Sequence, residues 1–336
     1  MKHTGLVRAL RAVGVKLPQP RLEFMAMLIL GLIEARTVNL KRVVAKIQSC
    51  AQEDSIYRRA QRFFASQRLN HKVFMRLMLG MMNKERYSLC VDRTNWQFGK
   101  ININILMLAV CDEGLAIPLA FVLLDKQGNS NTLERTELLE KVLEVVKPEQ
   151  IEVLLADREF IGQDWFKFLV KHNIAFAIRI RKNSLLDAWY PVKGLYQKLA
   201  VGHTRCLQHR YAIYGCELAV AAARSPDNQL VIVVGKRPAH TLTNLYALRW
   251  HIESLFKALK SSGFQLEDTH LKQLSRLTNL VALVSLAFLW ALKVGHWQHA
   301  RKPIRLKSHG RKERSLFRLG LDFIQRALTN RDLDPS

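Results

Sequence analysis

The order of strand-like and helix-like segments between residues 87 and 180 constrains the fold most strongly. Three β-rich runs come first, separated by polar or glycine-containing turns, and a helix, a strand, a helix and a strand follow. Their ranges are, in order, 87–91, 103–110, 115–124, 132–146, 151–156, 163–172 and 174–180. This mixture predicts an α/β fold in which a mixed sheet is flanked by helices.

The rest of the chain differs in periodicity from this central part. Apolar residues recur at helical spacing before residue 83, whereas short strand-like runs and turn residues alternate from 183 to 237. We therefore expect an N-terminal helical domain and a small β-rich insertion in the core. The predicted segments are a helical DNA-binding domain (1–82), the first part of the core (83–182), the insertion (183–237), the second part of the core (238–300) and a basic tail (301–336).

Charge indicates a polyanionic partner. The chain carries 52 Lys and Arg against 28 Asp and Glu, a net charge of +24, and its pI of about 10.2 is in the range typical of nucleic-acid binding. Within residues 54–68, Arg58, Arg59 and Arg62 are candidate DNA contacts, although a solvated helix face explains them equally well. Seven Lys or Arg in 301–314 suggest a flexible arm along phosphates.

Compartment and membrane features are read from apolar runs and cysteines. The longest apolar run, 280–294, is shorter than the roughly 18 residues of a membrane span and predicts a buried helix, so no membrane partner is expected. No signal peptide is evident at the N-terminus, and five cysteines without a CxxC pair suggest free thiols in a reducing compartment. We therefore expect a cytoplasmic protein.

One group of side chains has the composition of a zinc site. His203, Cys206, His209 and Cys216 are residue types that bind zinc in a tetrahedral arrangement. Their spacing lacks the usual knuckle, so ordinary polar residues of a strand hairpin are the favoured interpretation.

Two aspartates follow predicted strands. Asp92 comes directly after the first β-rich run and Asp157 directly after the fourth. Functional groups of open α/β sheets gather at the carboxyl ends of strands, and hard carboxylate oxygens are ligands for Mg²⁺. The two aspartates predict a shared metal site, although a single Asp at the end of a strand is more often a turn or cap residue.

A predicted helix near the end of the core carries four polar side chains at regular offsets. Tyr246, Arg249, Glu253 and Lys260 are separated by three, four and seven residues. At about 100° per residue they fall within an arc of roughly 60° on a continuous helix. Surface ion pairing is the alternative explanation for this spacing.

These motifs resemble a known family, the bacterial insertion-sequence transposases of the DDE class that carry a Tyr-(2)-Arg-(3)-Glu-(6)-Lys signature. Here the signature is Tyr246, Arg249, Glu253 and Lys260 with every spacing kept. Residues 91–96 (VDRTNW) and 155–160 (LADREF) are similar to the aspartate motifs of that group. The resemblance extends from about residue 87 to residue 260.

The resemblance implies a ribonuclease H-like core with neighbouring first and fourth strands. It implies that Asp92, Asp157 and Glu253 are catalytic and hold two Mg²⁺ or Mn²⁺ ions. The implied reaction is hydrolysis at transposon ends, then attack by the freed 3′-OH on the opposite strand, giving a hairpin, and later on target DNA. Arg249 and Lys260 would hold phosphates, and Tyr246 would contact the DNA end.

Further expectations concern partners and aromatic residues. Joining two ends implies a homodimer assembled on double-stranded DNA, at terminal inverted repeats and target, in the nucleoid of a bacterium. Trp189 is a candidate for stacking on an extruded base, although packing in a small core is favoured. Trp96 and Trp250 are expected to buttress the site, and the loop 128–132 has no assigned role. A stand-alone nuclease and a non-catalytic, transposase-derived DNA-binding inhibitor are the alternative functions.

Overall fold

The protein forms two compact units. The computed structural model describes residues 3–12, 14–66, 70–82, 84–99, 101–308 and 310–330. A helical unit comprises 1–82, 96–103 and 256–336, and a sheet unit comprises 83–95 and 104–255. These two units divide the chain differently from the five segments that the sequence predicted, and the five-segment division stays a prediction.

The main sheet has nine strands in the part of the chain that the structure describes, in the order β3-β2-β1-β4-β5-β11-β10-β8, with β9 paired to β10. β1 is parallel to β4 and β4 to β5, whereas β2/β3, β5/β11 and β10/β11 are antiparallel. This mixed sheet confirms the predicted fold class. The strands are β1 (Tyr87–Phe98), β2 (Ile101–Asp112), β3 (Leu115–Leu124), β4 (Ile151–Ala156), β5 (Phe176–Arg179), β8 (Thr204–Cys206), β9 (Tyr211–Ile213), β10 (Cys216–Arg224) and β11 (Leu230–Gly235).

The β-rich region after β5 continues the main sheet. β11 pairs with β5 from Val233↔Arg179 to Gly235↔Ala177, and it pairs with β10 from Gly235↔Ala219 to Leu230↔Arg224. The two short strands β6 (Leu185–Leu186) and β7 (Tyr190–Pro191) form a separate hairpin. The strands that the sequence predicted in 183–237 are therefore present, and the longest two extend the core.

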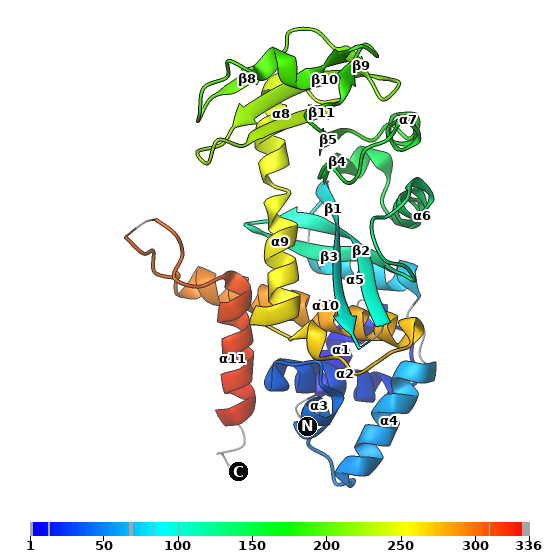
Figure 1. Ribbon diagram of the computed structural model, residues 1–336. Coiled ribbons are helices and arrows are strands. Elements are labelled where there is room, and N and C mark those ends of the chain that lie inside the picture. Colours follow the sequence, from blue (N-terminus) through cyan, green and yellow to red (C-terminus); the bar gives the residue numbers. More distant parts are fainter. Residues whose placement is uncertain are drawn as a thin grey trace. The chain divides into compact units, whose positions relative to one another are not determined.

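Helices cover both faces of the sheet. Side chains alternate between faces along a strand, and Phe176 of β5 packs on Phe166 of α7 (Gln163–Lys171), with ring centroids 5.1 Å apart. Ala177 faces the other way, as does its partner Gly235, whose Cβ position would lie 3.0 Å from Leu242 of α8 (Ala239–Ala247). Helices α7 and α8 thus pack on opposite faces, and α6 (Thr132–Leu143) lies beside α7 (Figure 1).

The helical unit is built around α10 (Leu274–Arg301), which contacts α2, α4, α5 and α11. The other helices are α1 (Thr4–Ala12), α2 (Gln19–Ala35), α3 (Leu40–Val44), α4 (Glu53–Ser66), α5 (His71–Met82) and α11 (Leu316–Asn330). Short 3₁₀ segments occur at Pro148–Gln150, Val192–Tyr196 and Leu266–Asp268. The expected basic tail thus contains a regular helix, α11, packed against α10.

Close approach between α10 and α11 requires glycine. A Cβ at Gly295 would lie 1.9 Å from the Leu316 carbonyl oxygen, and one at Gly320 would lie 1.7 Å from that of Ala291. Among the described residues, α10 is the one helix long and apolar enough to cross a membrane, but 78% of its apolar window is buried in the protein. Such burial is typical of a core helix, as the apolar run 280–294 predicted.

Candidate active site

The register of β1 and β4 brings two aspartates together. The last paired residues of these parallel strands are Val91 and Ala156, so Asp92 and Asp157 come next at the same edge. Asp157 directly follows β4, as predicted. Asp92 does not end its strand, because β1 continues to Phe98, past the end of β4. The strand that the sequence predicted to end at residue 91 is therefore longer.

Arg249 lies between two of the predicted catalytic carboxylates. Its Nη1 donates to Asp92 Oδ2 at 2.9 Å, and its Nη2 donates to Glu253 Oε1 at 2.5 Å. The Arg249 residue is 7% exposed. The planar fork of a guanidinium suits two carboxylate acceptors. Arg249 thus connects the carboxylate of β1 to that of α9 (Trp250–Lys257).

Tyr246 and Arg179 face the second aspartate. The Tyr246 hydroxyl donates to Asp157 Oδ1 at 3.1 Å. Arg179 Nη1, from the end of β5, lies 3.7 Å from the same oxygen. Tyr246 was expected from the sequence. Arg179 was not, although its place at the carboxyl end of the parallel strand β5 was a signal that could have found it.

The helix that carries these residues is interrupted, which corrects the expectation of one continuous helix from 246 to 260. Helix α8 ends at Ala247 and α9 begins at Trp250. In between, the Arg249 amide donates to the Tyr246 carbonyl at 3.0 Å and the Ile252 amide to the Arg249 carbonyl at 3.1 Å. These three-residue steps tighten the backbone into a 3₁₀-like turn. The 100° spacing does not apply there, yet Tyr246, Arg249 and Glu253 still reach the carboxylate site.

Lys260 belongs to the helical unit. It lies in a π-helical turn, Ala258–Ser262, that follows α9. Its Nζ is 2.6 Å from Glu267 Oε1 and 5.7 Å from the centre of the Trp96 ring. Lys260 is therefore the member of the signature that pairs with a carboxylate outside the predicted triad.

Burial perturbs the ionisation of the site. Loss of hydration raises the pKa of Asp92 from 3.8 to about 6, and nearby Asp157 and Glu159 add to the rise, while the Arg93 amide and Arg249 oppose it. Burial also raises the pKa of Tyr246 to about 12, so its hydroxyl keeps its proton at neutral pH. Burial opposes the charge of Arg249, but its neighbours, above all Tyr246 and Asp92, raise its pKa overall.

The donor chemistry of the site fits a hard divalent cation. Asp92 and Asp157 offer carboxylates from neighbouring strands, which is what Mg²⁺ and Mn²⁺ bind. Among the described residues, no three His, Cys, Asp or Glu side chains stand together closely enough to hold a metal ion. Here Arg249 separates Asp92 from Glu253. A cation held by all three carboxylates would therefore require Arg249 to move.

Comparison with known proteins decides the family. Residues 84–290, more than half of the chain, match the family described as "Transposase DDE domain". The chain belongs to the DDE transposase domain family. A cryo-EM structure of the piggyBac transposase synaptic complex with hairpin DNA is similar to this DDE transposase domain protein with a TM-score of 0.52 at 10% identity, covering 98% of this chain and 78% of that chain. The likeness confirms the ribonuclease H-like fold. No curated protein sequence matches the chain.

A polar network that the sequence did not reveal joins the two aspartate motifs of this DDE transposase domain. Arg93 Nε lies 3.1 Å from Glu159 Oε1. The same Glu159 oxygen accepts hydrogen bonds from the Ser130 amide at 3.1 Å and the Ser130 hydroxyl at 3.2 Å. Arg93 also donates to Asn104 and Asn129. These partners hold the residues that follow Asp92 and Asp157, so the loop 128–132 has a structural role.

The positions of Arg93 and Glu159 in the two aspartate motifs were the sequence signal that could have predicted this network. Arg93 directly follows Asp92, and Glu159 comes two residues after Asp157. An arginine beside one aspartate and a glutamate close to the other form an ion pair once the two strands are neighbours. The same loop also begins α6, where Asn131 and Glu134 form a capping box.

The predicted tryptophans occupy three different environments. Trp189 is 74% exposed, next to Tyr190 in the β6–β7 hairpin, so the favoured expectation of core packing was wrong. Trp250 is 64% exposed and does not buttress the site. Trp96 is buried in the helical unit beneath Lys260.

The three predicted arginines of α4 differ in their contacts within the protein. Arg59 donates to the Pro20 carbonyl at 2.8 Å, and its guanidinium lies 4.3 Å from the centre of the Phe24 ring. Arg58 and Arg62, on the same helix, line a surface hollow.

The four side chains considered for zinc do not meet in a metal site. Cys206 pairs across strands with Ala221, and Cys216 pairs with Ile213. The hairpin interpretation of this segment is therefore supported.

Proposed function

We propose that this protein is a transposase that cuts DNA at the ends of a mobile element and joins them to target DNA. Asp92, Asp157 and Glu253 are the metal-binding and catalytic carboxylates in this proposal. The observation that carries it is the register of β1 and β4, which sets Asp92 beside Asp157, with Glu253 linked to Asp92 through Arg249. Family membership supports the same reaction class.

The bound cofactor in this proposal is a pair of Mg²⁺ or Mn²⁺ ions. Such ions, when bound, activate an attacking oxygen and stabilise the leaving oxygen at a phosphodiester. The two aspartates hold them from rigid strands, which fixes the position of the reacting phosphate. Arg93 and Glu159 hold the backbone that follows each aspartate, so they act as positioning residues.

Arg249 and Tyr246 change partners in the proposed cycle. Without metal, the Arg249 fork neutralises Asp92 and Glu253 and Tyr246 bonds to Asp157. A cation held by these carboxylates would take the place of the guanidinium, and the planar fork of Arg249 would then fit a DNA phosphate bidentately. Metal loading and DNA binding would then reinforce each other.

Several finer features belong to the same proposal. The freed 3′-OH attacks the opposite strand to make a hairpin, and exposed Trp189 stacks on the base that this distortion extrudes. Lys260 leaves Glu267 for a phosphate. Two copies assemble on terminal inverted repeats as a homodimer in the bacterial cytoplasm. Similarity to a protein whose structure contains hairpin DNA supports the hairpin step.

Cleavage of labelled duplexes tests the proposal. A duplex carrying the DNA that flanks the gene would be incubated with Mg²⁺ and the wild type, Asp92→Asn, Asp157→Asn or Glu253→Gln. Each of these three substitutions should slow cutting and joining by at least about 100-fold, because each replaces a negatively charged metal ligand with a neutral amide. Asp164→Asn, an exposed change on α7, is the matched control and should act as the wild type.

Three outcomes separate the functions. Specific nicks and joined products from wild type and control alone establish the transposase. Cutting without joining in every condition would mean a stand-alone nuclease. If the wild type binds the ends yet neither cuts nor joins with Mg²⁺ or Mn²⁺, the protein is a DNA-binding inhibitor.

A further inference from the structure

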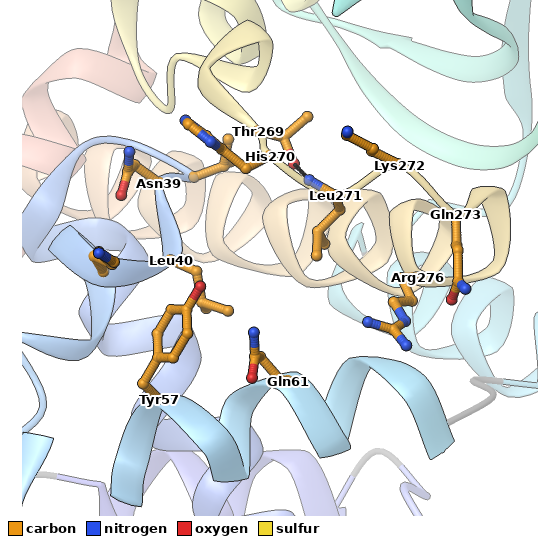
Figure 2. Close-up of a pocket in the computed structure, with 12 residues that line it drawn as sticks. Asn39, Leu40, Tyr57, Gln61, Thr269, His270, Leu271, Lys272, Gln273 and Arg276 are labelled. Carbon is orange, nitrogen blue, oxygen red and sulfur yellow. Dashed lines mark hydrogen bonds between the residues drawn. The ribbon is translucent and has the colours of Figure 1, made fainter. Parts of the chain in front are cut away.

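A hollow in the helical unit lies outside the carboxylate site. Its volume is about 480 Å³, and three segments far apart in sequence line it: residues 38–41, α4, and residues 269–276 at the start of α10. Figure 2 shows Tyr57 and Gln61 rising from α4 with Arg276 facing them across the hollow. The segment 269–276 was not considered for binding from the sequence.

The hollow continues into a second one. This neighbour, of about 600 Å³, shares Gln61 and Arg276 with the first and adds Arg58 and Arg62. We call the two together the α4 groove. Its cationic side chains are Lys41, Arg58, Arg62, Lys272 and Arg276, and no Asp or Glu among the described residues lines it.

These five cations have no carboxylate partner among the residues that the structure describes. Arg276 is half-buried, and its Nε is enclosed without a hydrogen-bond partner there. The two acids that precede the segment 269–276 have other partners: Glu267 pairs with Lys260, and Asp268 accepts a bond from Thr37. Glu53 and Asp54, in the first turn of α4, do not line the groove. An unpaired cation cluster of this kind repels itself, so it is stabilised by an external anion.

The shape and chemistry of the α4 groove fit a repeating anion. Arg58 and Arg62 are one helical turn apart, a rise of about 6 Å. On the opposite wall, Lys272 lies just before α10 and Arg276 lies in its first turn. Asn39, Gln61 and Gln273 add amide groups that can donate to phosphate oxygens. Duplex DNA presents a negative charge every 1.7 Å or so along its axis.

We propose that the α4 groove binds the sugar-phosphate backbone of duplex DNA without reading its sequence. The proposal rests on the proposed function only for the identity of the polyanion. In this proposal, residues 269–276, which come after α9 in the chain, contact the same DNA as residues 38–41 and α4. Lys272 and Arg276 are the new binding residues.

Binding would be measured with full-length protein in EDTA, using fluorescence anisotropy of a labelled duplex of arbitrary sequence over a series of salt concentrations. Two double variants remove opposite walls, Lys272→Ala/Arg276→Ala and Arg58→Ala/Arg62→Ala. Each should weaken binding about tenfold and reduce the slope of log K against log salt by about 2, because each lost phosphate contact contributes about 0.9. Arg8→Ala/Arg326→Ala removes two exposed charges outside the groove as the matched control.

DNA binding at the α4 groove is refuted if both double variants bind DNA with the same affinity and the same slope of log K against log salt as the control, while the wild type binds and cuts DNA. Equal binding of a polyglutamate peptide, lost in the same variants, would also overturn the assignment to duplex DNA. If the wild type binds through the groove but never cuts, the α4 groove stands and the transposase proposal fails. A melting temperature equal to that of the wild type in each variant confirms that a loss of binding does not come from a loss of folding.

Discussion

Arg249 and Arg276 are both partly enclosed arginines, yet their surroundings are opposite. In the sheet unit, the Arg249 fork donates to Asp92 and Glu253. In the helical unit, Arg276 lines a hollow with Lys272 and has no carboxylate partner among the described residues. The first cation is neutralised within the protein, and the second awaits an external anion.

This difference separates two kinds of positive charge in one basic chain. Net charge alone predicts a polyanion partner but not where it binds. In the protein without a bound cation, arginines paired with carboxylates contribute mainly to stability and to the position of the carboxylates, whereas unpaired arginines are available to bind an external anion.

The largest effect is expected from Arg249→Ala in the metal-free protein. Removing the guanidinium leaves Asp92 and Glu253 without their shared partner. The Arg249–Asp92 pair is the buried one of the two, and loss of one member of a buried pair costs about 3 kcal/mol or more. Urea unfolding in EDTA measures this change in the free energy of unfolding. Added Mg²⁺ should recover more stability in the variant than in the wild type, since the cation replaces the lost charge.

Arg158→Ala is the matched control for that experiment. Arg158 lies beside Asp157, and its side chain is exposed. It should leave both the stability and the Mg²⁺ response unchanged. Equal responses of Arg249→Ala and Arg158→Ala would show that Arg249 does not neutralise the carboxylates.

The pH dependence of stability is expected to be the next largest effect. The pKa of Asp92 rises from 3.8 to about 6 on folding, so the folded protein holds a proton that the unfolded chain has released between these values. The stabilisation is present below pH 3.8 and is lost as the pH rises through about 6. It amounts to at most about 3 kcal/mol, at roughly 1.4 kcal/mol per unit.

The comparison of wild type with Asp92→Asn isolates this contribution. Thermal unfolding in EDTA between pH 4.5 and 7.5, within the range of ordinary buffers, should show the wild type losing stability relative to the variant as the pH rises. A pH-independent difference between the two proteins would contradict the buried environment of Asp92. Asp164→Asn, on the exposed start of α7, should track the wild type.

The smallest effects concern neighbours on α4. Arg59→Ala should destabilise the protein by about 1 kcal/mol, because it removes the contacts with Pro20 and Phe24, with little change in DNA affinity. Arg58→Ala should do the reverse, weakening DNA binding a few-fold without loss of stability. Chemical denaturation measures the stability of both variants, and fluorescence anisotropy measures their DNA affinity. If stability and DNA affinity change in the same way in both variants, the two arginines do not have separate roles.

Periodicity was sufficient to predict the sheet. The strands from β2 to β5 and helices α6 and α7 were expected within a few residues, because buried strands need continuous apolar runs such as β4. β1 began where predicted but continues from residue 91 to Phe98. The pairing of β1 with β4 came from the family resemblance, since alternation within a strand says nothing about its neighbours. The extension of the sheet by β10 and β11 depends on long-range pairing and was not predicted.

The candidate site was predictable in its residues but not in its contacts. Spacing indicated Tyr246, Arg249 and Glu253, yet the break between α8 and α9 depends on backbone hydrogen bonds that no side-chain pattern shows. The exposure of Trp189 was missed for a similar reason: a two-residue strand pair is too small to have a core of its own. The α4 groove was missed because its two walls are more than 200 residues apart in sequence.

The tight turn between Tyr246 and Ile252 also limits how the gene can change. Its three-residue hydrogen bonds set the rotation that directs the hydroxyl of Tyr246 to one aspartate and the guanidinium of Arg249 to the other. A residue inserted or deleted there would redirect every side chain that follows by about 100°. In a library of single-codon insertions and deletions, this segment should therefore be among the least tolerant of the chain, even at positions where most substitutions are accepted.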